Sequence, residues 1–334
     1  MNQQRQLVGV ALAMLAMVLF GAVRYEHFAS AYNALEFGRY NAMFVMISIG
    51  MAFVIMSGGI DLSVGSVAAL SSVVSALVSP HSAAGALASG VLTGAACGAC
   101  NGLIVTRLRI QPFIATLAMT MAAHGVALLL ADNQPVAVSY DTGFTELGQG
   151  DWLGLPVPMW FAGAVFVMAV VAHGHSAFGR HSLAIGGSPE AAQLMGLNVQ
   201  RQLLLVYVVS GALAGLAGVM LAAQGSGQPN EGLGWDLFAI SAVVVGGTLL
   251  TGGAGSIVTT LLGVLLLGLV FNLLNFENGL GRITLSSYWQ SVVRGMFLLA
   301  VVLLQAHLLR RRVRDQGPEK LRTKAQRNQA PGGA

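Results

Sequence analysis

Long uncharged apolar runs alternate with short polar segments along almost the whole chain. A helix rises about 1.5 Å per residue, so an uncharged run of about twenty residues can cross the roughly 30 Å apolar core of a membrane. The runs lack the period-two alternation of a membrane β-barrel. The pattern predicts an all-α, polytopic membrane bundle of about ten transmembrane helices, with boundaries near residues 80 and 252 left open. The expected spans are approximately 7–23, 41–57, 62–79, 83–105, 111–131, 157–175, 203–224, 237–251, 255–275 and 289–309.

The composition indicates that most of the surface faces lipid. Of the 334 residues, 55% are hydrophobic and only 9% are charged, whereas about 25% of the residues of a soluble domain are charged. This difference excludes a soluble enzyme. The 43 glycines follow no Gly-X-Y period, and they suit membrane helices that approach closely through small residues.

The arginines indicate the orientation, because Lys and Arg near helix ends stay preferentially on the cytoplasmic side. Ten spans place both termini on one side, and that side holds Arg5, Arg107, Arg109, Arg180, Arg201, Arg310, Arg311, Arg312 and Arg314. The other side holds Arg24, Arg39 and Arg282. We therefore expect both termini to be cytoplasmic, with a transmembrane domain at residues 1–309 and a basic, disordered cytoplasmic tail at residues 310–334.

The sequence lacks motifs for nucleotide, metal or hydrolytic chemistry. A phosphate-binding loop ends in Gly-Lys-Ser/Thr, and the only lysines, Lys320 and Lys324, have neither neighbour. The seven histidines form no His-Glu-x-x-His pattern, and Asp61 is the single acid embedded between spans. We expect a chain that is not an enzyme, has no metal site and binds no cofactor itself.

A glycine pair interrupts the chain after the second apolar run. About 16 apolar residues before Ser57 provide only about 24 Å of helix, and the chain then reads SGGIDLSVGS over residues 57–66. Gly58 and Gly59 let the backbone leave helical geometry, and Asp61 can cap the next helix by accepting from the amide of Ser63 or Val64. This predicts a helix start at membrane depth. The alternative is an ordinary turn in which Asp61 is only a cap.

A similar arrangement returns in the second half of the chain. The short run from Leu237 ends in VGGTLLTGGAGSI, residues 245–257, with glycine pairs at Gly246 and Gly247 and at Gly252 and Gly253. Short, glycine-interrupted spans at corresponding places in two halves are typical of a transport pathway. The alternative is again a pair of ordinary turns between helices.

The cytoplasmic loop between Arg180 and Arg201 predicts a short helix. Ser188 is a good N-cap, Pro189 suits the first helical position, and Glu190 favours the positive end of the helix dipole. Gly196 provides a left-handed stop after Ala191–Met195. The apolar face formed by Ala191, Leu194 and Met195 has no core of its own, so we expect it to dock on a partner; the alternative is that it folds back onto the bundle.

Three segments together resemble the membrane permeases of ribose-, xylose- and galactose-type ABC importers. They are SGGIDLSVGSV, AIGGSPEAAQLMGL and DLFAISAVVVGGTLLTGGAGS, and the likeness covers nearly the whole chain. Within that family, LNFENGLGRITLSSYW at residues 274–289 is most similar to galactofuranose permeases.

The resemblance implies a permease domain at residues 1–309 in the bacterial inner membrane, with no enzyme activity of its own. It implies a second permease subunit, expected to be a different chain, a cytoplasmic ATPase that holds ATP and Mg, and a periplasmic sugar-binding protein. The segment that engages the ATPase would comprise Gly186, Gly187, Ser188, Pro189, Glu190, Ala191, Leu194, Met195 and Gly196. The signature and pathway residues would be Gly58, Gly59, Asp61, Ser63, Gly65, Gly246, Gly247, Gly252 and Gly253.

The expected mechanism is alternating access, in which a monosaccharide passes between two permease subunits. A neutral sugar requires hydrogen-bonding partners but no counter-charge, which makes uncharged polar residues in the spans candidates for contact: Asn41, Asn101, Gln224, Asn272 and Asn275. Each could instead form a hydrogen bond between helices. The competing function is a proton-coupled secondary sugar transporter in which Asp61 carries the proton. The sequence does not reveal which sugar is carried.

Overall fold

The computed structural model describes residues 3–279 and the separate positions 289, 292, 295, 296, 299 and 303. The main helices are α1 (Gln3–Arg24), α2 (Ala31–Met56), α3 (Val64–Val78), α4 (Ala83–Arg107), α5 (Pro112–Leu130), α7 (Val157–His175), α10 (Val199–Ala222), α11 (Trp235–Val245) and α12 (Ile257–Gly279). The short elements are β1 (Val136–Ala137), α6 (Glu146–Gln149), β2 (Asp151–Trp152), β3 (Leu155–Pro156), α8 (Ala177–Gly187), α9 (Pro189–Leu194) and β4 (Ser226–Gly227).

The helical membrane architecture is confirmed. In the described part of the chain, six helices (α2, α4, α5, α7, α10 and α12) are long and apolar enough to cross a membrane, and Gly9–Arg24, α3 and α11 are shorter apolar helices. These nine helices correspond to the first nine predicted spans. The predicted span 289–309 is described only at separate positions and the tail 310–334 lies outside the described residues, so the count of ten and the orientation of the termini stay predictions.

The predicted start of the second span was wrong by ten residues. Helix α2 begins at Ala31, not at residue 41, with Ser30 as its N-cap. The predicted boundary lay beyond the charged residues Glu36 and Arg39, but these two side chains lie one turn apart and form an ion pair of 3.1 Å. Because the two charges face each other across one turn, the helix can continue through them.

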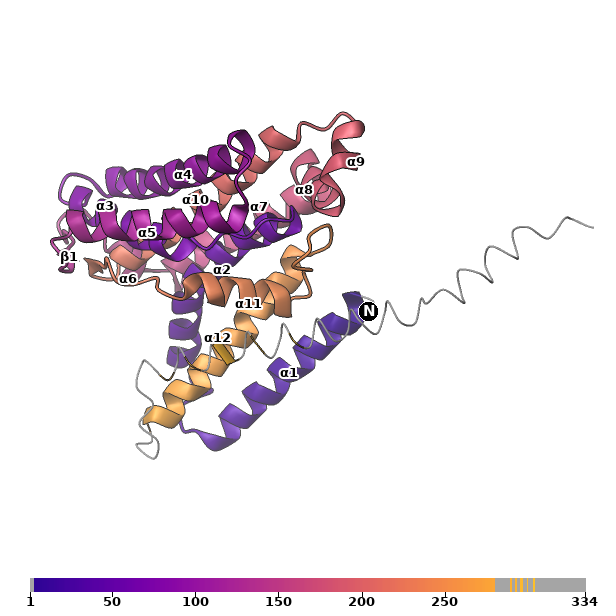
Figure 1. Cartoon of the computed structure of the whole chain (residues 1–334). Coiled ribbons are helices and arrows are strands. Elements are labelled where there is room, and N and C mark those ends of the chain that lie inside the picture. Colours follow the sequence, from indigo (N-terminus) through magenta and orange to yellow (C-terminus); the bar gives the residue numbers. More distant parts are fainter. Residues whose placement is uncertain are drawn as a thin grey trace, which may run out of the picture.

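Glycines bring α4 and α10 into close contact. Gly94 of α4 faces Gly215 of α10 so closely that a Cβ atom at position 94 would lie 2.7 Å from the Cα atom of Gly215. Helix α2 lies in the core, and residues 41–56 are all buried. Helices α1 and α12 lie side by side, apart from α3, α4 and α5 (Figure 1).

The connecting segments gather at two ends of the bundle. At one end β1 pairs with β4, and Thr142 donates a hydrogen bond to the carbonyl oxygen of Ser79. At the other end Gly253 donates a backbone hydrogen bond to Met56. This arrangement agrees with the alternation of outside and inside loops that the spans predict. We call the end with β1 and β4 the predicted outer end, and the end with Gly253 the predicted inner end.

The segment before α11 departs from the expected simple outside loop. The amide of Gln228 donates to Ser72 Oγ in α3 at 3.1 Å, and Gly232 contacts Gly65 at the start of α3. The chain therefore runs inward along α3 before α11 begins, and Trp235 is buried. Helix α11 has 11 residues, or about 16 Å of helix, which is half of a membrane core.

Candidate functional site

The three glycine-containing segments singled out from the sequence meet at one point, at the predicted inner end. Gly253, between α11 and α12, donates its amide to the carbonyl oxygen of Met56 at 3.0 Å. A Cβ atom at Gly253 would lie 2.8 Å from the Cα atom of Gly187, and one at Gly252 would lie 2.9 Å from the Cα atom of Gly58. We call the cluster of Gly58, Gly186, Gly187, Gly252 and Gly253 the glycine junction.

Four of the five junction positions require glycine, for two reasons. Gly58, Gly252 and Gly253 have φ values of +86°, +82° and +75°, which side chains rarely tolerate. Gly186 has an ordinary helical backbone, but a side chain there would overlap the Met56 carbonyl oxygen. The junction therefore joins the ends of α2 and α8 to the turn after α11 without intervening side chains.

Three signature glycines outside the junction, Gly59 after α2 and Gly246 and Gly247 after α11, have different roles. Gly246 packs against the backbone of Thr259 in α12, and Gly247 has a φ of +88° that ends α11. A Cβ atom at Gly59 would lie 2.6 Å from the hydroxyl oxygen of Tyr207. These positions shape the two helix breaks, but they lie outside the junction itself.

Asp61 is buried in a network of hydroxyl and amide groups. Its Oδ1 atom accepts from the amide of Ser63 at 3.0 Å and from Ser63 Oγ at 2.6 Å. Its Oδ2 atom accepts from Ser210 Oγ at 2.9 Å, and Asn101 donates to Ser63 Oγ at 2.9 Å. The acceptance from the Ser63 amide is as the sequence predicted. Asn101, a candidate sugar contact, lies in this network.

The short cytoplasmic-loop helix forms as predicted, as α9. Ser188 Oγ accepts from the amide of Ala191 at 3.2 Å, and Gly196 has a φ of +85°. Ala192 is buried at its base, whereas Leu194 and Met195 are 90% and 70% exposed. Helix α8 precedes α9 directly, so α9 is joined to the glycine junction through Gly186 and Gly187.

A cavity of about 250 Å³ lies between the outer half of α2, α11 and α12. Three of the five candidate sugar-contacting residues, Asn41, Asn272 and Asn275, line it. Gln224 does not line it. Its Nε2 atom lies 3.7 Å from Met43 Sδ, and its backbone carbonyl oxygen accepts from Gln149 Nε2. The remaining lining residues are Asn33, Glu36, Phe37, Tyr40, Phe44, Phe238, Gly268 and Phe271.

The amides of the cavity are partly paired with each other. Asn272 Nδ2 donates to Asn33 Oδ1 at 2.9 Å, and Asn33 donates back at 3.3 Å. Asn41 is buried and donates to the carbonyl oxygen of Phe37 at 2.8 Å, but its Oδ1 atom has no hydrogen-bond partner among the described residues. A buried acceptor without a donor is costly, and this atom lies against the backbone of Gly268 in α12.

Aromatic rings also line the cavity. The rings of Phe44 and Phe238 have centroids 4.2 Å apart, and Tyr40 meets Phe44 edge-on at 5.2 Å. Phe238 lies 5.9 Å from Phe271. A lining of aromatic rings and amides suits a small ligand with both C–H and hydroxyl groups.

The cavity continues into a wider opening at the predicted outer end. Asn33, Asn272 and Asn275 line both spaces, and the opening is also lined by Arg24, Tyr25, Glu26, Phe276 and Gly279. Access is therefore from the end that carries the α1–α2 loop.

Sequence reasoning missed Asn33 and Glu36. The lining positions 33, 36, 37, 40, 41 and 44 are spaced by three and four residues, the signature of one helix face. The face could have been read from the sequence if the helix had been started before Glu36 rather than at residue 41.

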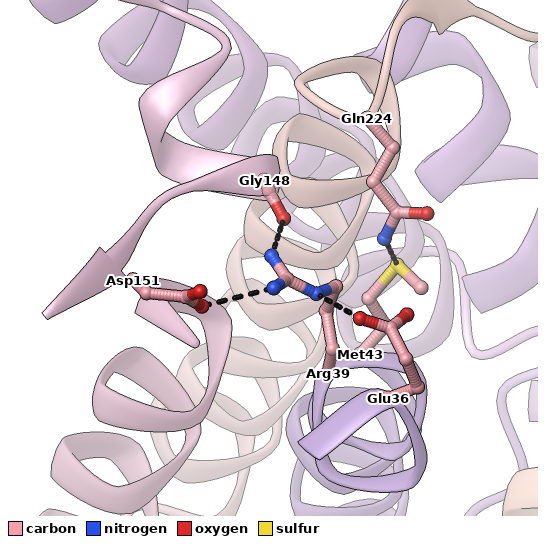
Figure 2. A network of polar contacts seen from close by, with 6 residues as sticks. All are labelled: Glu36, Arg39, Met43, Gly148, Asp151 and Gln224. Carbon is pink, nitrogen blue, oxygen red and sulfur yellow. Dashed lines mark hydrogen bonds and ion pairs between the residues drawn. The ribbon is translucent and has the colours of Figure 1, made fainter. Parts of the chain in front are cut away.

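Arg39 connects this part of α2 to the outer loop, the segment that contains Gly148 and Asp151. Its Nε atom binds Glu36 Oε1 at 3.1 Å, its Nη1 atom donates to the carbonyl oxygen of Gly148 at 2.9 Å, and its Nη2 atom binds Asp151 Oδ1 at 2.9 Å. Figure 2 shows the guanidinium between the carboxylate of Glu36 and the loop. The Arg39 side chain is only 14% exposed, so the described residues hold it in place.

Comparison with known proteins assigns the family. The profile described as "Branched-chain amino acid transport system / permease component" matches residues 33–302. The chain belongs to this permease family. As a member, the permease is a multi-pass protein of the bacterial inner membrane, and the predicted class of transport subunit is confirmed at this level.

Individual relatives are named for sugar import. The permease is 39% identical over 312 residues to the ribose import permease protein RbsC of Escherichia coli K12, with 90% of this chain and 93% of the relative covered. It is 39% identical over 303 residues to RbsC of Bacillus subtilis (90% and 92% covered) and 37% identical over 309 residues to the L-arabinose transport system permease protein AraH of Escherichia coli K12 (92% and 91% covered). No solved structure matched significantly. The expected ribose-type ABC permease family is thus confirmed, whereas these relatives do not show galactofuranose as the sugar.

Proposed function

We propose that this permease is one of two membrane subunits of an ATP-driven importer and carries a neutral monosaccharide by alternating access. The observation that carries the proposal is the cavity of amides and aromatic rings in a chain similar to ribose and arabinose permeases. Its volume of about 250 Å³ is below the roughly 300–1,000 Å³ of pockets for drug-sized ligands, so it suits a small ligand.

The cavity favours a sugar over an amino acid. The amino acid has to be considered because the family description names branched-chain amino acid transport. Glu36 is the one charged residue among the described residues that line the cavity. A zwitterionic amino acid requires a cation for its carboxylate, because an unpaired buried charge is costly. A neutral sugar requires only hydrogen-bonding groups, which the asparagines provide.

In this proposal the partner ATPase, which holds ATP and Mg, docks on α9. Leu194 and Met195 are large apolar side chains exposed at the end of a well-capped helix. Burying each of them would stabilise a complex by about 1.5–3 kcal/mol. Movement of α9 would reach α2 and the turn after α11 through the glycine junction.

For the finer assignment, we propose galactofuranose as the sugar, on the likeness of residues 274–289 to galactofuranose permeases. The complex would include a second, different permease subunit and a periplasmic sugar-binding protein. The ribose and arabinose names of the relatives provide the sugars for comparison.

The alternative of a proton-coupled transporter is not favoured. Three hydrogen bonds from Ser63 and Ser210 occupy the carboxylate of Asp61. Asp61 is not among the residues that line the cavity. These contacts support a role in shaping the turn between α2 and α3.

The test is uptake by proteoliposomes that contain the permease with its ATPase, second permease subunit and binding protein. We expect accumulation of labelled galactofuranose that requires ATP and persists when an uncoupler collapses the proton gradient. Uptake by the permease without the ATPase, abolished by the uncoupler, would overturn the ATP-driven mechanism. Uptake of ribose or arabinose but not galactofuranose would overturn the sugar assignment alone, and uptake of branched-chain amino acids without any sugar would overturn the substrate class.

A further inference from the structure

We infer that Glu36 contacts the transported sugar and that Arg39 is a positioning residue that fixes Glu36 against the outer loop at Gly148 and Asp151. The inference rests on the proposed function, because it names the acceptor that recognises the sugar in the cavity. It concerns two residues that were not among the site residues predicted from the sequence.

Glu36 is placed to accept hydrogen bonds from a ligand. It lines the cavity, its side chain is 46% exposed, and only its Oε1 atom has a hydrogen-bond partner in the described part of the chain. Oε2 is thus available to a sugar hydroxyl, and hydrogen bonds to a carboxylate are roughly twice as strong as those between neutral groups.

The neighbouring groups point to the same ligand. The cavity is also lined by the amide side chains of Asn33, Asn272 and Asn275. A carboxylate among amides matches a molecule with several hydroxyl donors, and the rings of Tyr40, Phe44 and Phe271 match its C–H face. The carboxylate would repel an anion, so the site selects a neutral sugar over a phosphorylated one.

Arg39 determines where the Glu36 carboxylate lies. A glutamate side chain has several rotamers, and fixing one of them before binding reduces the entropy that binding costs. Three nitrogens of the planar guanidinium are each held by a different group, Glu36, Gly148 and Asp151 (Figure 2). Lysine cannot reproduce this geometry, because it is a single point donor.

The outer loop is itself fixed, so the chain of contacts is continuous. A Cβ atom at Gly148 would lie 2.7 Å from the backbone nitrogen of Gln224, so the loop packs against the end of α10. The loop positions Asp151 and Gly148, these hold Arg39, and Arg39 holds Glu36. Asp151 therefore affects sugar affinity without touching the sugar.

The experiment measures sugar affinity of the full-length permease in lipid nanodiscs by saturation-transfer NMR, with galactofuranose, ribose and L-arabinose as probes. We expect Glu36→Ala to weaken binding by about tenfold or more and Glu36→Gln by about threefold, because the amide remains a neutral acceptor. Asp151→Asn should weaken binding about threefold, and Arg39→Lys by a similar factor. The matched control is Asp132→Asn, an exposed carboxylate of the α5–β1 loop with no described partner.

A double-mutant cycle separates positioning from general damage to the loop. If Asp151 acts through Glu36, then Asp151→Asn has no further effect on affinity in the Glu36→Ala background. Additive effects of the two substitutions would overturn the positioning role. Unfolding temperatures of all variants, measured in parallel, identify any loss of affinity that comes from unfolding, and Glu36→Gln keeps the shape of the side chain.

The outcomes distinguish this inference from the proposed function. If the wild-type complex shows ATP-driven sugar uptake but Glu36→Ala and Glu36→Gln bind and transport sugar normally, the inference is wrong and the function stands. The inference is also wrong, and the function stands, if the wild-type complex transports sugar but the permease in nanodiscs binds none. If the wild-type complex neither binds nor transports any neutral sugar, the proposed function fails as well.

Discussion

Gly186 and Gly187 are a matched pair for testing the glycine junction. Both lie in the last turn of α8, both have ordinary helical φ values, and they are adjacent in the chain. Gly186→Ala adds a methyl group inside the junction, whereas Gly187→Ala adds the same group where nothing lies within 4 Å. The two variants therefore differ only in whether the methyl group meets the end of α2 and the turn after α11.

The magnitude follows from the local geometry. An alanine Cβ atom at position 186 would overlap the carbonyl oxygen of Met56 and lie 2.6 Å from the nitrogen of Gly253. Favourable contacts between non-bonded carbon atoms lie at about 3.5–4.0 Å, so the backbones must separate by about 1 Å. The separation weakens the hydrogen bond from Gly253 to Met56, which contributes about 0.5–1.5 kcal/mol, and over-packing costs about 1–3 kcal/mol more.

We therefore expect Gly186→Ala to lower the free energy of unfolding by about 1.5–4.5 kcal/mol. Gly187→Ala should leave it unchanged or raise it by up to about 1 kcal/mol, since alanine favours helix. If the junction transmits movement from α9, Gly186→Ala should also lower the number of sugars transported per ATP hydrolysed by the reconstituted complex.

The assay combines thermal unfolding of the purified permease with parallel measurements of ATP hydrolysis and sugar uptake in proteoliposomes. Gly187→Ala controls for the change in helix propensity. Equal stability and equal coupling in the two variants would refute the close backbone packing at Gly186. Lower stability with unchanged coupling would retain the packing but refute its role in transmission.

Further predictions concern α9, the Asp61 network and the contact between α4 and α10. Replacing Leu194 and Met195 together by Asp should abolish co-purification of the ATPase. The control Leu153→Asp, at a 93% exposed position at the opposite end, should not. Unchanged co-purification of the ATPase with the double variant would contradict docking on α9. Asp61→Leu leaves the buried donors of Ser63 and Ser210 without an acceptor, at a cost of about 1–3 kcal/mol each, and should prevent stable folding. Asp61→Asn retains an acceptor and should retain much of the uptake. Equal losses of unfolding temperature and uptake in the two variants would show that the charge itself is required. Gly94→Ala should destabilise the permease by about 1–3 kcal/mol through over-packing against Gly215. The control Gly125→Ala, which adds a methyl group with nothing within 4 Å, should not. Equal melting temperatures of the two variants would argue against the close approach of α4 and α10.

Local features of the sequence predicted the helices and their breaks well. Lipid excludes charge, so uncharged runs mark the apolar helices, and capping chemistry depends on neighbours in the chain. That is why α9 with its Ser188 cap, and the hydrogen bond from the Ser63 amide to Asp61, could be expected from local residue patterns. The start of α2 was missed although the Ser30 cap and the pairing of Glu36 with Arg39 are local, whereas the contact of Arg39 with Asp151 depends on the tertiary structure.

The functional arrangement depends on contacts between distant parts of the chain. The sequence alone identified the glycines near residues 58, 186 and 252 as three separate features, but only the tertiary structure places them in one junction. The same holds for the asparagines: Asn41 and Asn272 line the cavity, whereas Asn101 supports the Asp61 turn. A polar side chain in a membrane helix must find a partner, and whether that partner is another helix or a ligand is decided by how the helices pack, which no local pattern encodes.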